Sequence, residues 1–172
     1  MRDANIKKLV LAALMAALTY VATSIVQIPS PMQGYVNLGD CAVLLSAWVL
    51  GPLYGGAAAG VGSMLADLLS GYAHYAPGTF AIKLAMAVVA ALLFQALQRR
   101  RAPNVLLSQA VSGFAAEIIM VAGYFGYACL WLGKGLAAAA SVPGNIIQGL
   151  FGLAAAAAVY AVLSRGHALT HI

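Results

Sequence analysis

Four ionisable residues interrupt the apolar runs of this chain: Asp40, Asp67, Lys83 and Glu117. They stand out because the 172-residue sequence is 63% hydrophobic and only 8% charged. A charge at bilayer depth costs roughly 2.5–3.5 kcal/mol on insertion scales, so such residues normally pair, face a polar cavity or line a substrate path. We therefore expect them to form a polar pocket. The alternative interpretation is a buried structural ion pair.

Other chemistry is poorly represented in the sequence. There is no phosphate-binding loop, zinc-protease motif or nucleophile elbow, so ATP hydrolysis by this chain is not expected. Cys41 and Cys129 lie in apolar segments without metal-ligand or disulfide spacing, and no metal and no cofactor is predicted. The carboxylates together with His74 leave an intramembrane enzyme open as an alternative. A stand-alone secondary carrier for a small polar solute is another.

The elements that must hold these residues are membrane-spanning helices. The mean hydropathy is +0.93, and apolar stretches of about membrane length follow one another. We predict an all-α polytopic membrane protein with six transmembrane helices in one membrane domain, residues 1–172. The expected spans are residues 9–28, 38–50, 53–71, 79–98, 105–132 and 142–163. The first follows a basic N-terminus and lacks a small-residue cleavage site, so it is expected to be retained.

The stretch from residue 38 to residue 71 needs two helices. As one helix it would be roughly 50 Å long, whereas a hydrocarbon core is roughly 30 Å thick. Gly51 and Pro52 in its middle supply a natural break. The first of the two helices is short for a complete span.

The positions of the basic residues also favour six transmembrane spans. With six spans and both termini cytoplasmic, the loops and termini on the inner side hold almost all of them, as the positive-inside rule requires. These are Arg2, Lys7, Lys8, Arg99, Arg100, Arg101 and Arg165, with Lys134 alone outside. The net charge of +5 therefore reflects membrane orientation, and no nucleic acid is expected as a partner.

This orientation divides the four ionisable residues by depth. The expected external connections are residues 29–37, 72–78 and 133–141. Asp40, Asp67 and Lys83 each lie within a few residues of one of these connections. Glu117 lies nearer the midplane of its helix. A pocket open to the outside fits this arrangement.

Two helix surfaces extend the expected pocket. Glu117 and Tyr124 share a face with Met120, Tyr127 and Trp131, because these residues follow steps of three or four. A shorter polar stripe in the last helix consists of Asn145, Gln148 and Gly152. The alternatives are an interfacial belt for the rings, which is favoured for Trp131, and helix-to-helix hydrogen bonds for the amides.

Two external loops complete the candidate site. Residues 29–37 carry Gln33, Tyr35 and Asn37 above Asp40, and this segment is either a lid or an ordinary hairpin connection. Residues 72–75 add Tyr72, His74 and Tyr75 near Asp67 and Lys83. For His74, a solvated loop histidine is the commoner alternative to a ligand contact.

A different surface lies on the first helix. Ala12, Ala13, Ala16 and Ala17 form two overlapping small-xxx-small pairs, which allow another helix to approach closely. Packing within the protein would explain them equally well.

Three segments together resemble a known family. Asn37-Leu-Gly-Asp40, then Leu50-Gly-Pro-Leu-Tyr-Gly-Gly56, then residues 62–72 (GSMLADLLSGY) resemble the substrate-binding S components of energy-coupling factor (ECF) vitamin importers, in the broad group that includes riboflavin-type members. The resemblance covers about the first hundred residues well and the rest mainly by helix count.

This resemblance implies a six-helix protein of a prokaryotic plasma membrane that captures a vitamin from outside. It further implies association with a transmembrane coupling (T) subunit and two cytoplasmic ATPases, with the alanines of the first helix as the docking surface. In such proteins the pocket lies in the outer half, under the loop after the first helix. The residues that select the substrate differ among members and are not matched here.

We therefore expect a high-affinity capture subunit of an ECF-type importer, not an enzyme. The expected ligand is a flat, polar-edged heterocycle that stacks on tyrosines and bonds to Lys83, Asn145, Gln148 and a carboxylate. A single-ring vitamin such as pyridoxine or a hydroxymethylpyrimidine is the first expectation, and riboflavin is the next.

Overall fold

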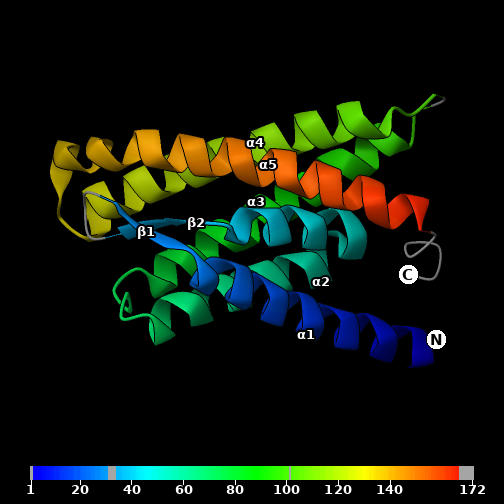
Figure 1. Ribbon diagram of the computed structural model, residues 1–172, viewed down its shortest axis with the longest axis horizontal. Helices are drawn as coiled ribbons and strands as arrows, with labels where there is room; N and C mark the ends of the chain where they lie inside the picture. The colour runs from blue at the N-terminus through cyan, green and yellow to red at the C-terminus, as the bar shows by residue number, and fades with distance from the viewer. Residues whose placement is uncertain (1, 31–33, 101, 167–172) are drawn as a thin grey trace.

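The computed structural model describes residues 2–30, 34–100 and 102–166, and these residues are almost entirely helical. The long helices are α1 (Arg2–Ile25), α2 (Gly39–Leu69), α3 (Ala76–Gln98), α4 (Val105–Gly126) and α5 (Val142–Arg165). A π-helical turn, η1 (Tyr127–Trp131), and a 3-10 segment, η2 (Gly135–Ser141), connect α4 to α5. All five long helices pack lengthwise into one bundle (Figure 1).

A short antiparallel sheet corrects the all-α prediction. Strands β1 (Gln27–Ser30) and β2 (Gly34–Asn37) pair in the register Ile28↔Val36 and Pro29↔Tyr35. The first helix consequently ends at Ile25 rather than at residue 28. Proline explains the change, because Pro29 cannot donate a helical hydrogen bond and disfavours the helical region for the residue before it.

The break predicted within residues 38–71 is confirmed at Gly51. This residue has φ 78° and ψ −175° inside α2, and Pro52 follows it. The two arms of α2, residues 39–50 and 52–69, fold back on each other: a Cβ added at Gly55 would lie 2.3 Å from the carbonyl oxygen of Ser46. In a straight helix these two residues would be roughly 13 Å apart. Figure 1 shows the two arms side by side, running in opposite directions.

By length and composition, five helices of the described residues are able to cross a membrane, with α2 counted once along its whole length. The prediction of six crossing segments counts its two arms separately. The number of crossings and the cytoplasmic position of the termini stay predictions.

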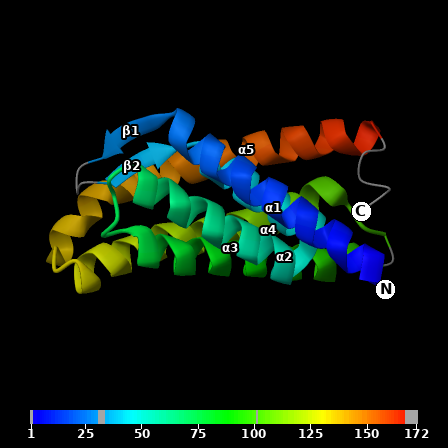
Figure 2. The same ribbon diagram turned by 90° about the horizontal axis from the view of Figure 1, so that it is seen from below.

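The bundle has two different ends. α1 begins and α5 ends at one end, where the connection from α3 to α4 also lies, whereas the β-hairpin and the η1–η2 connection lie at the opposite end (Figures 1 and 2). The first end carries Arg99 and Arg100 directly after α3 and Arg165 in the last turn of α5. Because Lys and Arg prefer cytoplasmic loops, this distribution supports the predicted orientation.

The core between these ends is built from α2, α3 and α4. Leu44, Met86 and Met120 are fully buried there, surrounded by alanines that allow the helices to approach closely. Nearer the basic end, Trp48 packs against Phe94 and Tyr160 with ring centroids 5.9 and 6.0 Å apart. The core thereby holds the two arms of α2 and the start of α3 in fixed positions.

We predict that Gly55→Ala destabilises the protein because the added methyl group would overlap the backbone of Ser46. Overpacking of this kind costs about 1–3 kcal/mol. Thermal unfolding in detergent micelles would measure the loss. The matched control is Gly126→Ala, where a Cβ meets no atom within 4 Å; equal melting temperatures for the two variants would contradict the hairpin packing of α2.

Candidate functional site

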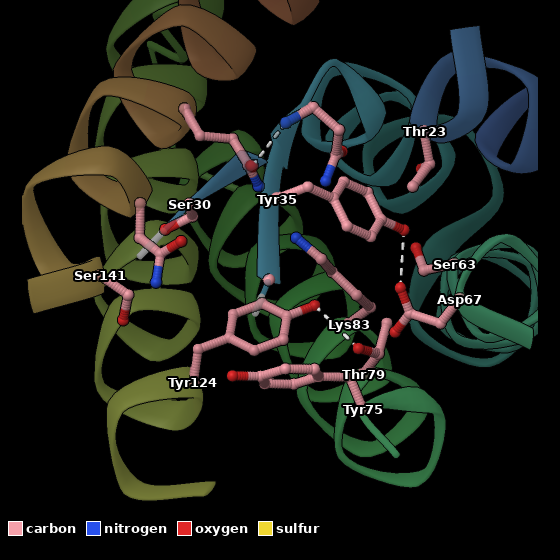
Figure 3. Close-up of a pocket in the computed structure, with 14 residues that line it drawn as sticks. Thr23, Ser30, Tyr35, Ser63, Asp67, Tyr75, Thr79, Lys83, Tyr124 and Ser141 are labelled. Carbon is pink, nitrogen blue, oxygen red and sulfur yellow. Dashed lines mark hydrogen bonds between the residues drawn. The ribbon is translucent and has the colours of Figure 1, made fainter. Parts of the chain in front are cut away.

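A small polar cavity lies beneath the β-hairpin, at the end of the bundle away from the termini. Its volume is about 50 Å³, and β1, β2 and all five long helices supply residues to its walls (Figure 3). The lining residues are Thr23, Ser30, Gly34, Tyr35, Asn37, Ser63, Asp67, Tyr75, Thr79, Lys83, Tyr124, Ser141, Asn145 and Gln148. Residues far apart in the sequence thus line one cavity.

Most of the residues predicted for the ligand site line this cavity. They are Tyr35, Asn37, Asp67, Tyr75, Lys83, Tyr124, Asn145 and Gln148. Asp40 lies behind the lining, Glu117 lies elsewhere, and Gln33 falls outside the described residues.

Five serine and threonine hydroxyl groups of the cavity were not predicted from the sequence. Thr23, Ser30, Ser63, Thr79 and Ser141 all line it. No signal in the sequence singled them out, because isolated serines and threonines in membrane helices also serve ordinary helix packing.

A buried ion pair between Lys83 on α3 and Asp40 on α2 lies at the base of the site. The Lys83 ammonium bonds Oδ1 of Asp40, and Gln148 Nε2 on α5 donates to Oδ2 at 2.6 Å. Gln148 Oε1 in turn accepts from the backbone N–H of Asn37 at 2.8 Å. Asp40 is therefore a positioning residue for Lys83, because both of its oxygens are engaged below the cavity.

The close approach of α5 to this pair requires a glycine. A Cβ at Gly152 would lie 2.7 Å from Cβ of Asp40. The face of α5 that carries Asn145, Gln148 and Gly152 is thus turned toward the site. Gly152 lies opposite Asp40. Asn145 and Gln148 are both buried.

The β-hairpin is tied to the end of α2 by two hydrogen bonds. Tyr35 Oη donates to Asp67 Oδ1 at 2.6 Å, and Gln27 Nε2 donates to Ser70 Oγ at 3.0 Å (Figure 3 shows the first). Burial, reinforced by the neighbouring Asp67 carboxylate, raises the pKa of the Tyr35 phenol. The phenol consequently stays protonated at physiological pH and acts as the donor.

Several polar atoms facing the cavity have no hydrogen-bond partner among the described residues. They are Thr23 Oγ1, Ser30 Oγ, Ser63 Oγ and Asp67 Oδ2. Leaving a buried polar group unsatisfied costs about 1–3 kcal/mol. These atoms come from α1, the hairpin and the second arm of α2, so one bound molecule that offers several donors would satisfy them together.

Aromatic rings form another wall of the cavity. Tyr124 donates to Thr79 Oγ1 at 3.1 Å, and its ring lies 5.4 Å from the Lys83 ammonium. The Tyr75 ring meets Tyr124 edge to face at a centroid separation of 6.4 Å. The cavity therefore combines a cation, a carboxylate and hydroxyls with stacking surfaces, the donor set expected for a flat, polar-edged ligand.

The expected place of Glu117 in the pocket is corrected by the structure. Its side chain points toward α5, where Oε2 would lie 2.7 Å from a Cβ added at Gly149. Both carboxyl oxygens are buried without a partner among the described residues. Glu117 instead borders a separate cavity of about 410 Å³ between α4 and α5, whose other lining residues, such as Phe114 and Leu150, are apolar or glycine. Helical phase with Tyr124 misled the prediction, because residues seven positions apart need not meet the same neighbouring helix.

The alanine stripe of α1 divides between two surfaces. Ala12 is buried and Ala16 is half-buried, and the carbonyl oxygen of Ala16 would lie 2.4 Å from a Cβ at Gly62 in α2. Ala13 and Ala17 are exposed. The inner pair therefore serves packing within the protein, and the outer pair remains available to a partner.

The chain is similar to known proteins over most of its length. The family described as "ECF-type riboflavin transporter, S component" matches residues 3–165. A relative from Pyrococcus woesei, described as "Uncharacterized protein in gap 3'region", is 37% identical over 134 residues, which is 77% of this chain and 85% of the relative. A solved structure described as "Structure and mechanism of the S component of a bacterial ECF transporter" superimposes with a TM-score of 0.67 at 18% identity, covering 94% of this chain and 97% of that one. At that identity, this last likeness shows a shared fold.

We predict that Asp40→Asn and Lys83→Met each destabilise the protein by about 3–5 kcal/mol, because each leaves one buried partner without its counterpart. The double variant should lose clearly less unfolding free energy than the sum of the losses in the two single variants. A double-mutant cycle of unfolding free energies in detergent micelles tests this. Strictly additive costs would contradict a direct ion pair.

Proposed function

Because this chain belongs to the S-component family of ECF-type riboflavin transporters, we propose that the cavity beneath its β-hairpin is the binding site for a flat heterocyclic vitamin. As a family member, the protein is a multi-pass membrane subunit of a prokaryotic transporter that binds substrate, and it is not an enzyme. The observation that carries the proposal is the group of buried, unpartnered polar atoms that faces the same cavity as the tyrosines.

Riboflavin is the leading ligand in this proposal. The family name supports it, and so does the chemistry of the walls. A three-ring heterocycle offers a surface for stacking on Tyr75 and Tyr124, and its polyhydroxylated chain supplies several hydrogen-bond donors. Asp67 Oδ2, which accepts but cannot donate when ionised, is suited to such a hydroxyl group.

A one-ring vitamin, which was the first expectation from the sequence, is the second candidate. The small cavity favours it: about 50 Å³ is far below the roughly 300–1,000 Å³ of common ligand pockets, so a smaller ligand requires less opening. Pyridoxine and a hydroxymethylpyrimidine belong to this class.

Either ligand requires movement of the β-hairpin. Three contacts hold it down: Tyr35 to Asp67, Gln27 to Ser70, and the Asn37 backbone to Gln148. We infer that the hairpin is a lid and that the present arrangement is its closed position. When it opens, Asp67 and Gln148 each lose a partner that a ligand can replace.

Energy for transport would come from other subunits. ECF S components work with a transmembrane T subunit and ATPases, and we propose that this chain docks to its T subunit through the exposed face of α1. That face carries Ala13 and Ala17 beside the exposed Leu14 and Leu18. With the basic end of the bundle cytoplasmic, the lid and cavity would open to the outside. Substrate uptake by the isolated chain in liposomes would instead indicate a stand-alone carrier.

Native mass spectrometry of the purified protein with riboflavin, pyridoxine and a hydroxymethylpyrimidine at equal concentration tests the ligand. We expect one of the three to bind in a one-to-one complex at submillimolar concentration. The mass of any co-purified molecule would separate three-ring from one-ring vitamins. If none of the three bound, the proposed function would be wrong.

We predict that Asp67→Asn weakens binding of that ligand about tenfold or more, because a charge-assisted hydrogen bond is lost in a buried site. Isothermal titration in micelles would measure the change in Kd. The control is Glu117→Gln, a carboxyl change of the same size at a buried position outside the cavity, which should leave Kd unchanged. Equal effects of the two substitutions would argue against the cavity as the site.

A further inference from the structure

A continuous series of aromatic rings runs from the surface to the cavity. Trp131 lies 6.3 Å from Tyr127 between ring centroids, Tyr127 lies 6.1 Å from Tyr75, and Tyr75 lies 6.4 Å from Tyr124 in the cavity wall. The outermost ring is 78% exposed, whereas Tyr75 is 8% exposed. The series therefore joins bulk surroundings to the proposed ligand site.

A second branch reaches the lid. From Tyr75 it continues to His74 at 4.8 Å, to Tyr72 at 6.4 Å and to Tyr35 of β2 at 4.6 Å. Tyr35 is the residue whose hydroxyl holds the hairpin to Asp67. The rings thus connect the surface with both the wall of the cavity and its cover.

The π-helical turn η1 gives the outer ring its orientation. Tyr127 and Trp131 are its first and last residues, and their rings are stacked with an interplanar angle of 14°. Single π-helical turns of this kind are frequent at functional sites. One face of Trp131 packs on Tyr127, which leaves the other face open.

Tyr127 is itself held rigidly. Its hydroxyl donates to the carbonyl oxygen of His74 at 2.9 Å, and its ring atoms would lie 2.7 Å from a Cβ added at Gly78. An interfacial membrane anchor does not need a ring fixed in this way, since rings in an aromatic belt only have to reach the headgroup level. A stacking platform does need it, because a fixed ring loses little entropy when a ligand binds.

Resting on the proposed function, we propose that the open face of Trp131, supported by Tyr127, is an outer capture site on which a flat heterocyclic ligand stacks before the lid opens. The ligand then passes His74 and Tyr75 to reach the cavity. Trp131 contributes to the encounter but does not contact the ligand in the closed, bound state. Its contribution is therefore to the association and dissociation rates in equal measure, and Kd does not depend on it.

Stopped-flow binding to the protein in lipid nanodiscs tests this, with riboflavin or pyridoxine as the probe, whichever binds. Trp131→Leu keeps an apolar side chain for the membrane surface but removes the ring, and it should lower kon and koff each about fivefold, the effect of losing one aromatic pair, with Kd unchanged. Trp131→Phe keeps a stacking ring and should restore kon to within about twofold of wild type. Leu130→Ala is the matched control, because Leu130 is 84% exposed on the same turn and has no ring.

Each result decides the proposal. A loss of kon in Trp131→Leu, restored in Trp131→Phe and absent in Leu130→Ala, supports the capture site. Equal losses in Trp131→Leu and Leu130→Ala would mean that both residues only anchor the turn in the membrane, and the proposal would be wrong. A change in Kd would also overturn it, because Trp131 would then contact the bound ligand. If wild type binds and Trp131→Leu matches it, only the capture site fails; if wild type binds no vitamin, the capture site and the proposed function fail together.

Discussion

The arrangement of the site depends on the ion pair between Lys83 and Asp40. Two charges removed from water gain enough from each other only when the remaining hydrogen-bonding atoms are also satisfied. Here Gln148 satisfies the second carboxylate oxygen and bonds the backbone at Asn37, so α2, α3, α5 and β2 meet at one point. This requirement also explains why Gly152 faces Asp40, because a larger residue would separate α5 from the pair.

The polar groups nearer the hairpin differ from those around the ion pair in their hydrogen bonding. The lower layer is paired, whereas the upper layer, formed by Thr23, Ser30, Ser63 and Asp67 Oδ2, lacks partners among the described residues. A protein that is optimised for stability alone would satisfy or remove such groups. Their concentration under a hairpin held by few side-chain contacts fits a site that is closed now and completed by a ligand.

The two ends of the bundle are specialised in different ways. The aromatic and polar end carries the β-hairpin, the cavity and the ring series that begins at Trp131, whereas the basic end carries both termini. The exposed face of α1 runs the length of the bundle between them, and only part of its alanine stripe is used for internal packing. The proposed ligand site and the proposed docking face of α1 are therefore separate surfaces of one chain.

The sequence by itself determined the membrane class, the approximate limits of the helices and the break at Gly51, because composition, periodicity and proline act locally along the chain. It also identified most of the charged and amide residues that line the cavity, since a polar side chain in an apolar helix needs a reason to be there. Only the tertiary structure decided that Asp40 pairs with Lys83 beneath the cavity, that Glu117 faces another groove, and that hydroxyls from α1 and α2 join the site. The physical reason is that pairing and facing depend on how neighbouring helices rotate and approach, which is set by contacts between residues distant in the sequence.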